Sequence, residues 1–342
     1  MSPAPAALVS GVGLVVPGAE SPAELVRAGD AARTGGRAPA EDWFDPVRYL
    51  GRRGWKYLST PTRYLLAATG GALGPAESAG APAAPDRAAI CLGSNHAVSA
   101  MHAAMDATLR AEGVRGLSPA ELPGFSVNTP ASWLSIVRER RGFSVTLTDP
   151  LVAGLQALLL AAQAIRAGQV DDVLAGATEE TPAPGRAAGP VTGGACVLAL
   201  RAVTPAGAPA LAEVCAGVSR FLPRRAGGPD PAALAAAGAA VARLAPPGTD
   251  LPYAFCGPEG TAPVDAAIRA ALSERGVTVL DRRYPGADGS AGTVSPLLQF
   301  AGLLHEHGGG LVVAAAAEGH LAAVPTRPAR AEQAGRPDGG EE

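Results

Sequence analysis

Side chains that could act as nucleophiles or bases are few in this chain of 342 residues, which has four cysteines, five histidines and a single lysine, Lys56. Cys256 ends an apolar run, where a buried, unreactive thiol is the default interpretation and a substitute nucleophile is the alternative. The His-Glu-His string at residues 305–307 offers two metal ligands, but no third ligand follows at a usable spacing. Its place before three glycines favours the capped end of a helix. We therefore expect no metal site and no bound cofactor.

The composition excludes several classes of partner. A net charge of −3 provides no basic surface for nucleic acid. The longest apolar runs, residues 158–165 and 311–317, are too short to span a membrane, and nothing resembles a secretory signal. The cysteines lack paired spacing, which favours a reducing environment. We therefore expect a cytoplasmic protein that binds neither nucleic acid nor membranes.

The elements that must position any site alternate between strands and helices. Strand-like runs occur in two groups of five: residues 7–16, 88–93, 144–148, 172–177 and 195–200, then 211–218, 253–257, 277–280, 311–317 and 321–324. Helical patterns lie between them, at residues 61–73, 96–112, 150–167, 231–244, 263–274 and 294–305. This alternation predicts an α/β fold with a mostly parallel sheet covered on both faces. Five strands twice over predict a duplicated unit.

We place the two halves at residues 1–201 and 202–325. The remaining tail, residues 326–342, lacks apolar periodicity, and we expect it to be disordered.

Several strings resemble the β-ketoacyl synthase family in order and spacing: VSGVGLVVP at 9–17, FDPVRYLG at 44–51, GFSVTLT at 142–148, GLQAL at 154–158 and GQVDDVLAG at 168–176. The resemblance spans about residues 6 to 325. It implies the thiolase-like fold, in which duplicated five-stranded mixed-sheet halves form an α/β/α/β/α arrangement. Residues 150–167 would be its buried central helix.

Family members carry a cysteine where the strand turns into this helix, and the helix N-terminus lowers the pKa of the thiol. Without gaps from Gly142 to Gly154, the corresponding residue here is Leu151, which cannot form a thioester. We interpret Asp149 as the N-cap and Pro150 as the first helical residue.

The family also uses two histidines and a lysine. The corresponding strings lie near Gly257 and Ala287, and neither contains a histidine or a lysine. The resemblance therefore implies that the catalytic set is lost. An acyltransferase or hydrolase that uses Asp149, Cys256 or Glu259 stays open as an alternative.

The resemblance extends to the inactive chain-length factor, or ketosynthase β-subunit, of type II polyketide synthases. It implies an active ketosynthase as heterodimer partner, an acyl carrier protein that delivers the chain, and a role in setting chain length. The short chain favours a polyene-forming, highly reducing system. The main alternative is a homodimeric pseudo-ketosynthase that serves as a scaffold.

In this fold the strand before the buried helix pairs with its counterpart across a two-fold axis. Residues 144–148 are rich in β-branched residues and carry no charge, so a paired strand is expected. The resemblance places residues 123–136 beside the partner's acyl tunnel, although Phe125 and Trp133 could equally fill the core. The full set of candidate tunnel and interface residues is Phe125, Asn128, Trp133, Thr146, Thr148 and Asp149.

Overall fold

The structure is a computed structural model that describes residues 5–33, 43–78, 81–182, 192–203, 210–225 and 228–329. The N-terminal half contains β1 (Pro5–Val15), β2 (Ala88–Gly93), β3 (Ser144–Leu147), β4 (Asp172–Glu179) and β5 (Gly194–Arg201). The C-terminal half contains β6 (Ala212–Cys215), β7 (Val218–Phe221), β10 (Asp250–Cys256), β11 (Thr278–Arg282), β12 (Gly310–Ala315) and β13 (His320–Pro328).

The two halves repeat one strand order, which confirms the duplication. The first half runs β3-β2-β4-β5-β1, and the second runs β11-β10-β12-β13 with β6 and β7 both beside β13. In each half the first three strands are parallel and the later pairs are antiparallel.

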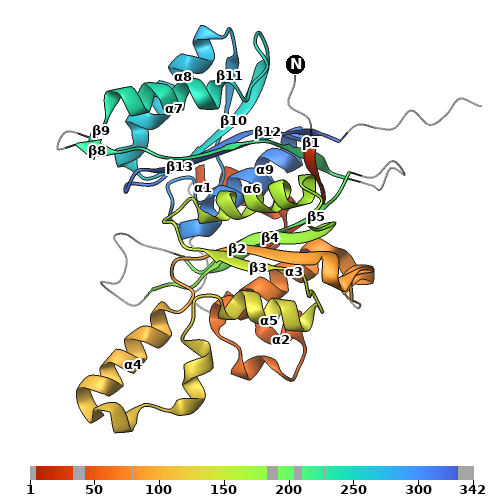
Figure 1. The fold of residues 1–342 in the computed structure, drawn as a ribbon, viewed down its shortest axis with the longest axis vertical. Coiled ribbons are helices and arrows are strands. Elements are labelled where there is room, and N and C mark those ends of the chain that lie inside the picture. Colours follow the sequence, from red (N-terminus) through yellow and green to blue (C-terminus); the bar gives the residue numbers. More distant parts are fainter. Residues whose placement is uncertain are drawn as a thin grey trace, which may run out of the picture.

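The two halves are not separate sheets. The 11-residue strand β1 pairs with β5 over Leu8–Val15, and its beginning pairs with β6. Because β6 also pairs with β13, the described strands of both halves form one 11-stranded sheet, which folds into two layers (Figure 1). The strand expected at residues 211–218 is divided into β6 and β7. Gly217 lies between them, against the carbonyl of Ala323, where a side chain would overlap.

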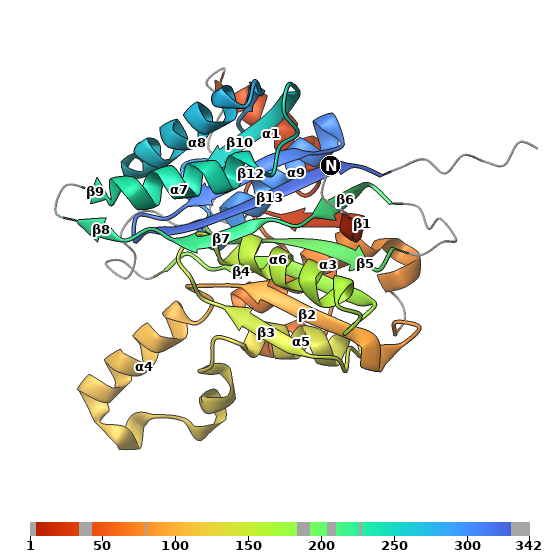
Figure 2. The same cartoon turned by 45° about the horizontal axis from the view of Figure 1, so that its top comes forward.

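Helices form the other layers of the α/β/α/β/α arrangement (Figures 1 and 2). The central layer holds α6 (Ala153–Arg166) and α9 (Ser295–His307), with α1 (Pro22–Arg33) beside α9. The outer layers hold α2 (Pro46–Leu50), α3 (Thr60–Ser78) and α5 (Thr129–Val137) on one side, and α7 (Pro231–Ala242) and α8 (Ala262–Glu274) on the other. α4 (Ser99–Glu112) projects from the body.

Short elements connect these parts. They are η1 (Trp55–Tyr57), η2 (Pro85–Arg87), η3 (Val114–Gly116), η4 (Pro119–Gly124), η5 (Glu259–Thr261), η6 (Gly292–Val294), β8 (Arg224–Arg225) and β9 (Gly228–Pro229).

α6 is the buried central helix, as predicted. Leu155 and Leu158 are fully buried in the central hydrophobic cluster, together with residues of α9. Two further clusters lie between the sheet and the outer helices, one against α3 and one against α7 and α8. Aliphatic side chains and alanine build most of these cores, because aromatic residues make up 4% of the chain.

The predicted start of the disordered tail, residue 326, is too early. Residues 326–328 belong to β13, where Thr326 pairs with Val214 of β6. Residues 330–342 lie outside the described part of the chain.

Candidate functional site

Leu151 lies on a sharp turn between β3 and α6. Its φ of 61° is in the left-handed region, which non-glycine residues adopt at a cost. The Val152 N–H donates to the Pro150 carbonyl at 2.6 Å, and the Ala153 N–H donates to the Asp149 carbonyl at 3.2 Å. A strained strand-to-helix turn of this kind presents a nucleophile at the start of a helix. The turn is retained although its residue is a leucine.

The prediction that Asp149 caps the helix and Pro150 begins it is wrong. α6 begins at Ala153, and Val152 is its N-cap residue. The Asp149 carboxylate accepts a hydrogen bond from Gln156 Nε2 at 2.7 Å and lies 3.5 Å from His320 Nδ1. The sharp turn occupies the residues that would otherwise form the first helical turn.

The position predicted to replace the nucleophile and the two strings predicted to have lost their histidines lie close together in space. A Cβ added to Gly289 would lie 3.3 Å from Leu151 Cδ1 and 3.9 Å from the Pro258 side chain. The Gly257 N–H donates to the Ala287 carbonyl at 2.9 Å, which ties the two loops together. The turn at Leu151 and the two loops therefore meet at one place, and Leu151, 9% exposed, fills part of it.

Glu179 holds the N-terminal half to the C-terminal half near this place. Its buried carboxylate accepts hydrogen bonds from the N–H groups of Asn95 and His96 at 2.9 and 2.7 Å, and from Thr293 Oγ1 at 2.7 Å. Burial raises the pKa of Glu179, and these hydrogen bonds oppose the shift. We did not predict this role, although two carboxylates directly after a buried strand are an unusual sequence signal.

Gln299 fixes one of the converging loops. This buried residue of α9 accepts from the Tyr284 N–H at 2.9 Å and donates to the carbonyls of Tyr284 and Pro285 at 3.1 and 3.0 Å. The Ser295 hydroxyl accepts from the Ala291 N–H at 2.9 Å. The loop geometry is therefore set by buried polar side chains that need no catalytic function.

Cys256 is unsuited to act as a nucleophile. It is fully buried, and this burial, with the charge of Asp288 nearby, raises the pKa of its thiol. Its Sγ contacts the Gly286 carbonyl at 3.6 Å. Burial likewise raises the pKa of the Cys91 and Cys196 thiols to about 12, so neither is a ready thiolate.

The His-Glu-His string ends α9. The helix is followed by Gly308 in the left-handed conformation, and the Gly308 N–H donates to the Leu304 carbonyl. His307 Nε2 accepts from Arg282 Nε at 2.5 Å. Among the described residues, no three histidine, cysteine or carboxylate side chains form a metal-binding group.

Several candidate interface residues lie in or near α5, which contacts β3. Phe125 and Trp133 are 48% and 37% exposed, so the interpretation that they fill the core is wrong. Asn128 precedes α5, and its side chain does not cap this helix. Thr146 lies in β3 and Thr148 just after it.

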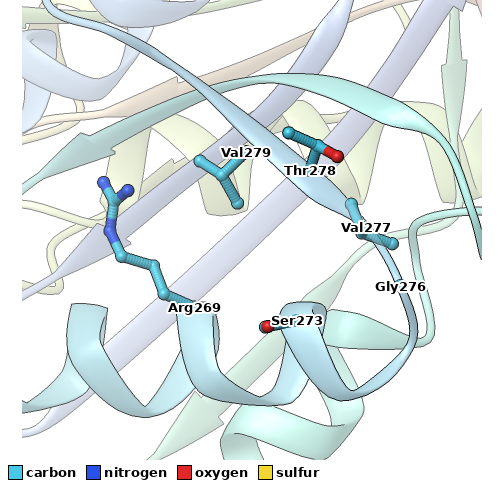
Figure 3. Close-up of a pocket in the computed structure, with 6 residues that line it drawn as sticks. All are labelled: Arg269, Ser273, Gly276, Val277, Thr278 and Val279. Atoms are coloured by element: carbon cyan, nitrogen blue, oxygen red, sulfur yellow. The ribbon is translucent and has the colours of Figure 1, made fainter.

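Of two cavities in the described part of the chain, one adjoins the turn at Leu151 and the other does not. A groove of about 670 Å³ between α6 and β7 includes Asp149 and Gln156 and therefore adjoins it. A cavity of about 460 Å³ lies between α8 and β11, in an outer layer (Figure 3). There Arg269 is bound by Asp265 and Asp281.

The family model for the N-terminal domain of β-ketoacyl synthases matches residues 27–196. Comparison of the sequence with curated proteins found no match. Within the described residues, none of the helices combines the length and apolar character needed to span a bilayer.

Solved ketosynthase structures resemble nearly the whole chain. One chain comes from a complex described as "AntDE:AntF (apo): type II PKS acyl-carrier protein in complex with its ketosynthase bound to the hexaketide"; its TM-score is 0.76 at 19% identity, over 94% of this chain and 99% of that one. "The ishigamide ketosynthase/chain length factor" has a TM-score of 0.74 at 20% identity, over 95% and 99%. The oxazolomycin ketosynthase domain OzmH KS8 of Streptomyces albus JA3453 has a TM-score of 0.69 at 18% identity, over 98% and 99%.

Together the matched domain and the architecture define a ketosynthase-like protein. Residues 27–196 match the N-terminal domain of the β-ketoacyl synthases, and the chain as a whole has the thiolase-like fold of the solved ketosynthases.

Proposed function

We propose that this chain is a non-catalytic ketosynthase-like subunit, a chain-length factor, that pairs with an active ketosynthase in type II polyketide biosynthesis. The observation that carries the proposal is Leu151 on a retained nucleophile turn, facing two loops that contain no histidine. The backbone of this turn is strained although its residue is not a nucleophile. We expect such a turn where the fold is kept for binding a partner subunit. Two of the similar solved structures are of a type II ketosynthase in complex with its acyl-carrier protein and of a ketosynthase/chain length factor.

The free edges of the sheet favour β3 as the pairing strand. β3 and β11 end the described sheet on its two sides. β11 carries Asp281 and Arg282, and charged edge residues oppose strand pairing. β3 has the sequence SVTL, with no charge, so its edge is open to a partner strand.

The surface beside β3 also suits a partner. α4 has no buried residue, although its sequence contains apolar side chains such as Leu109. Phe125, Trp133 and Ile136 expose large apolar side chains in the same region of the chain. Exposed apolar groups of this kind mark interaction sites. We assign Phe125 and Trp133 to the wall that limits the partner's acyl tunnel.

A basic strip provides a surface for the acyl carrier protein. Residues 46–63 contain no carboxylate, and Arg52, Arg53 and Lys56 are all exposed; Arg48 is exposed too but pairs with Glu20 at 2.6 Å. Such a surface attracts an acidic partner. We assign this strip to carrier-protein docking and expect both proteins to act in the cytoplasm, where the four buried free thiols would persist.

We further propose a polyene-forming, highly reducing system rather than an aromatic one, as the resemblance to short chain-length factors implies.

Co-expression with a cysteine-containing type II ketosynthase from the same organism tests the proposal, with size-exclusion chromatography and light scattering as the readout. We expect a 1:1 heterodimer. A stable homodimer that ignores the ketosynthase would support the scaffold alternative, and acyl transfer by this chain alone would overturn the non-catalytic assignment.

A matched pair of proline variants tests the role of β3. The carbonyls of Phe143 and Leu147 accept hydrogen bonds from the N–H groups of Ile90 and Ser94, in and just after β2. Alternate residues of a strand direct their backbone groups to opposite sides, so the N–H of Thr146 faces the free edge. In β11 the Thr278 N–H donates to the Thr249 carbonyl, on the side of β10. The N–H of the next residue, Val279, therefore faces the free edge of β11. Thr146→Pro should abolish the heterodimer and Val279→Pro should not. Equal effects of the two variants would show that β3 is not the pairing strand.

A further inference from the structure

A small cavity lies where α4 begins, apart from the turn at Leu151. Its volume is about 210 Å³, and its walls come from the residues before and within α3, from the first turn of α4 and from Gly124. Leu58, Val98 and Met101 contribute apolar surface, and Glu180, directly after β4, contributes a carboxylate. Cavities at the carboxyl ends of parallel strands are common ligand sites, and β2 and β4 both end here.

The Glu180 carboxylate is only partly satisfied. The residue is 8% exposed, and its Oε1 accepts a hydrogen bond from the Ala100 N–H at 2.7 Å. Its Oε2 receives no hydrogen bond from any residue that the structure describes. Burial raises the pKa of Glu180, the hydrogen bond from Ala100 and the charge of His102 oppose this shift, and the nearby charge of Glu179 adds to it.

Arg63 lines the same cavity but is engaged elsewhere. Its Nε donates to the Leu58 carbonyl at 2.8 Å, and its guanidinium lies 5.0 Å from the centre of the Trp55 ring. No described residue forms an ion pair with Glu180 within 4.0 Å. A buried carboxylate without a cation is costly, and a ligand that brings a cation with hydrogen-bond donors would remove that cost.

We propose that this cavity binds a primary ammonium group carried on a short hydrocarbon chain, with the ammonium on Glu180 Oε2 and the hydrocarbon against Leu58, Val98 and Met101. The size agrees, because an apolar cavity of roughly 150 Å³ accepts a ligand such as benzene. A carboxylate ligand would be repelled by Glu180, and an alcohol of the same length would gain the apolar contact without the charge pairing. The inference does not depend on pairing with a ketosynthase.

The methionines make the site observable. The chain has three of them, Met1, Met101 and Met105. Met101 lines the cavity, and Met105 lies one turn further along α4, outside its lining. In a protein labelled with ¹³C in the methionine methyl groups, n-butylammonium should therefore shift the Met101 signal and leave the Met105 signal in place. Met101→Leu and Met105→Leu assign the two signals.

The titration uses the purified full-length chain, or its co-expressed complex if the chain is soluble only in that form. We expect saturable binding of n-butylammonium that is at least tenfold tighter than that of n-butanol, with no binding of butyrate. Glu180→Gln keeps an acceptor for the Ala100 N–H, and it should weaken n-butylammonium binding at least tenfold. Glu274→Gln, at an exposed position of α8, should bind as the wild type does.

Three results would overturn the inference: no saturable shift of Met101, equal affinity for n-butylammonium and n-butanol, or equal affinity in Glu180→Gln and wild type. The comparison of ligands on the wild-type protein decides the question even if the Glu180→Gln variant does not fold. Loss of the ketosynthase heterodimer would be a separate result, because binding is read from the assigned Met101 signal of this chain.

Discussion

Glu179 Oε1 accepts a 2.7 Å hydrogen bond from Thr293 Oγ1, and the two residues are 114 positions apart in the chain. The bond joins the end of β4 to η6, so it links the two halves of the duplicated fold. Thr293 also lies against α6, where its carbonyl would overlap any side chain at Gly154. The pair therefore fixes the position of the central helix relative to both halves.

Glu179→Ala should lower the free energy of unfolding by about 3 kcal/mol, because it leaves one buried and two partly buried N–H groups without an acceptor. Urea unfolding at neutral pH measures the loss. The control is Glu274→Ala at the exposed position on α8, which should change stability by less than about 0.5 kcal/mol. Equal losses in the two variants would show that the Glu179 network contributes little.

Because Leu151 has a left-handed conformation, we expect its glycine and alanine variants to show the reverse of the usual order of stability. Leu151→Gly should be more stable than Leu151→Ala by about 1 kcal/mol, since glycine adopts this φ without strain. Leu155 in α6 is the matched control, and there Leu155→Gly should be less stable than Leu155→Ala by about 1 kcal/mol. The same order at both positions would mean that the turn at Leu151 is not left-handed in solution.

The purified chain should be chemically inert. It should take up no radiolabelled acyl group from acyl-CoA or acyl carrier protein, and it should resist a cerulenin-type inhibitor, because Leu151 replaces the nucleophile and Cys256 is buried. Intact-protein mass spectrometry detects either adduct. A thioester that disappears in Cys256→Ala would identify Cys256 as a substitute nucleophile.

Trp133→Ala should leave the proposed heterodimer intact and lengthen or scatter its products, because it removes a bulky exposed side chain beside the proposed tunnel. Leu211→Ala is the control, since Leu211 is 51% exposed and lies just before β6, outside this region and outside the basic strip. Product lengths are read by mass spectrometry of the reconstituted system. Unchanged products from an intact complex would show that Trp133 has no role in chain length.

The raised pKa of Glu180 predicts a pH trend. In the unfolded chain this carboxyl titrates near its ordinary value of 4.5, and in the folded chain it titrates higher. Below 4.5 it is neutral in both states, so its burial has no charge cost; as pH rises through the folded pKa, that cost appears. Glu180→Gln should therefore gain stability relative to wild type as pH rises above 4.5, as measured by urea unfolding across pH.

The control for this trend is Leu155→Ala, whose deficit has no titratable source and should stay constant over the same range. A Glu180→Gln difference that is flat with pH, or that falls as pH rises, would contradict the assignment of an uncompensated buried carboxylate.

Local patterns in the sequence were sufficient for most elements. Alternation of apolar runs with helical periodicity located the ten expected strand positions and α3, α4 and α6 to α9, because burial on a regular element leaves a periodic pattern. The helices α1, α2 and α5 were missed. α2 has five residues, too few for a periodic pattern, and none of them is buried.

The prediction that the catalytic residues are absent also rests on the sequence and its family resemblance, since the types of residue in each string do not depend on folding. The first residue of α6 could not be predicted from the sequence. An Asp-Pro pair is typical of a cap, but the tertiary structure uses it in a sharp turn and begins α6 at Ala153. A cap preference of about 1 kcal/mol is small beside the packing that positions a buried helix.

The sequence by itself determined the fold class and the duplication, and it predicted the loss of the nucleophile and histidines. Only the tertiary structure decided that Leu151, Pro258 and Gly289 meet, that Glu179 bonds to Thr293, and that Glu180 faces a cavity. Leu151 and Glu179 each meet residues that are about 100 or more positions away in the chain. Glu180 reaches its cavity because β2 and β4 end at the same edge of the sheet. Such proximity depends on how the layers pack, and no local pattern of residues encodes it.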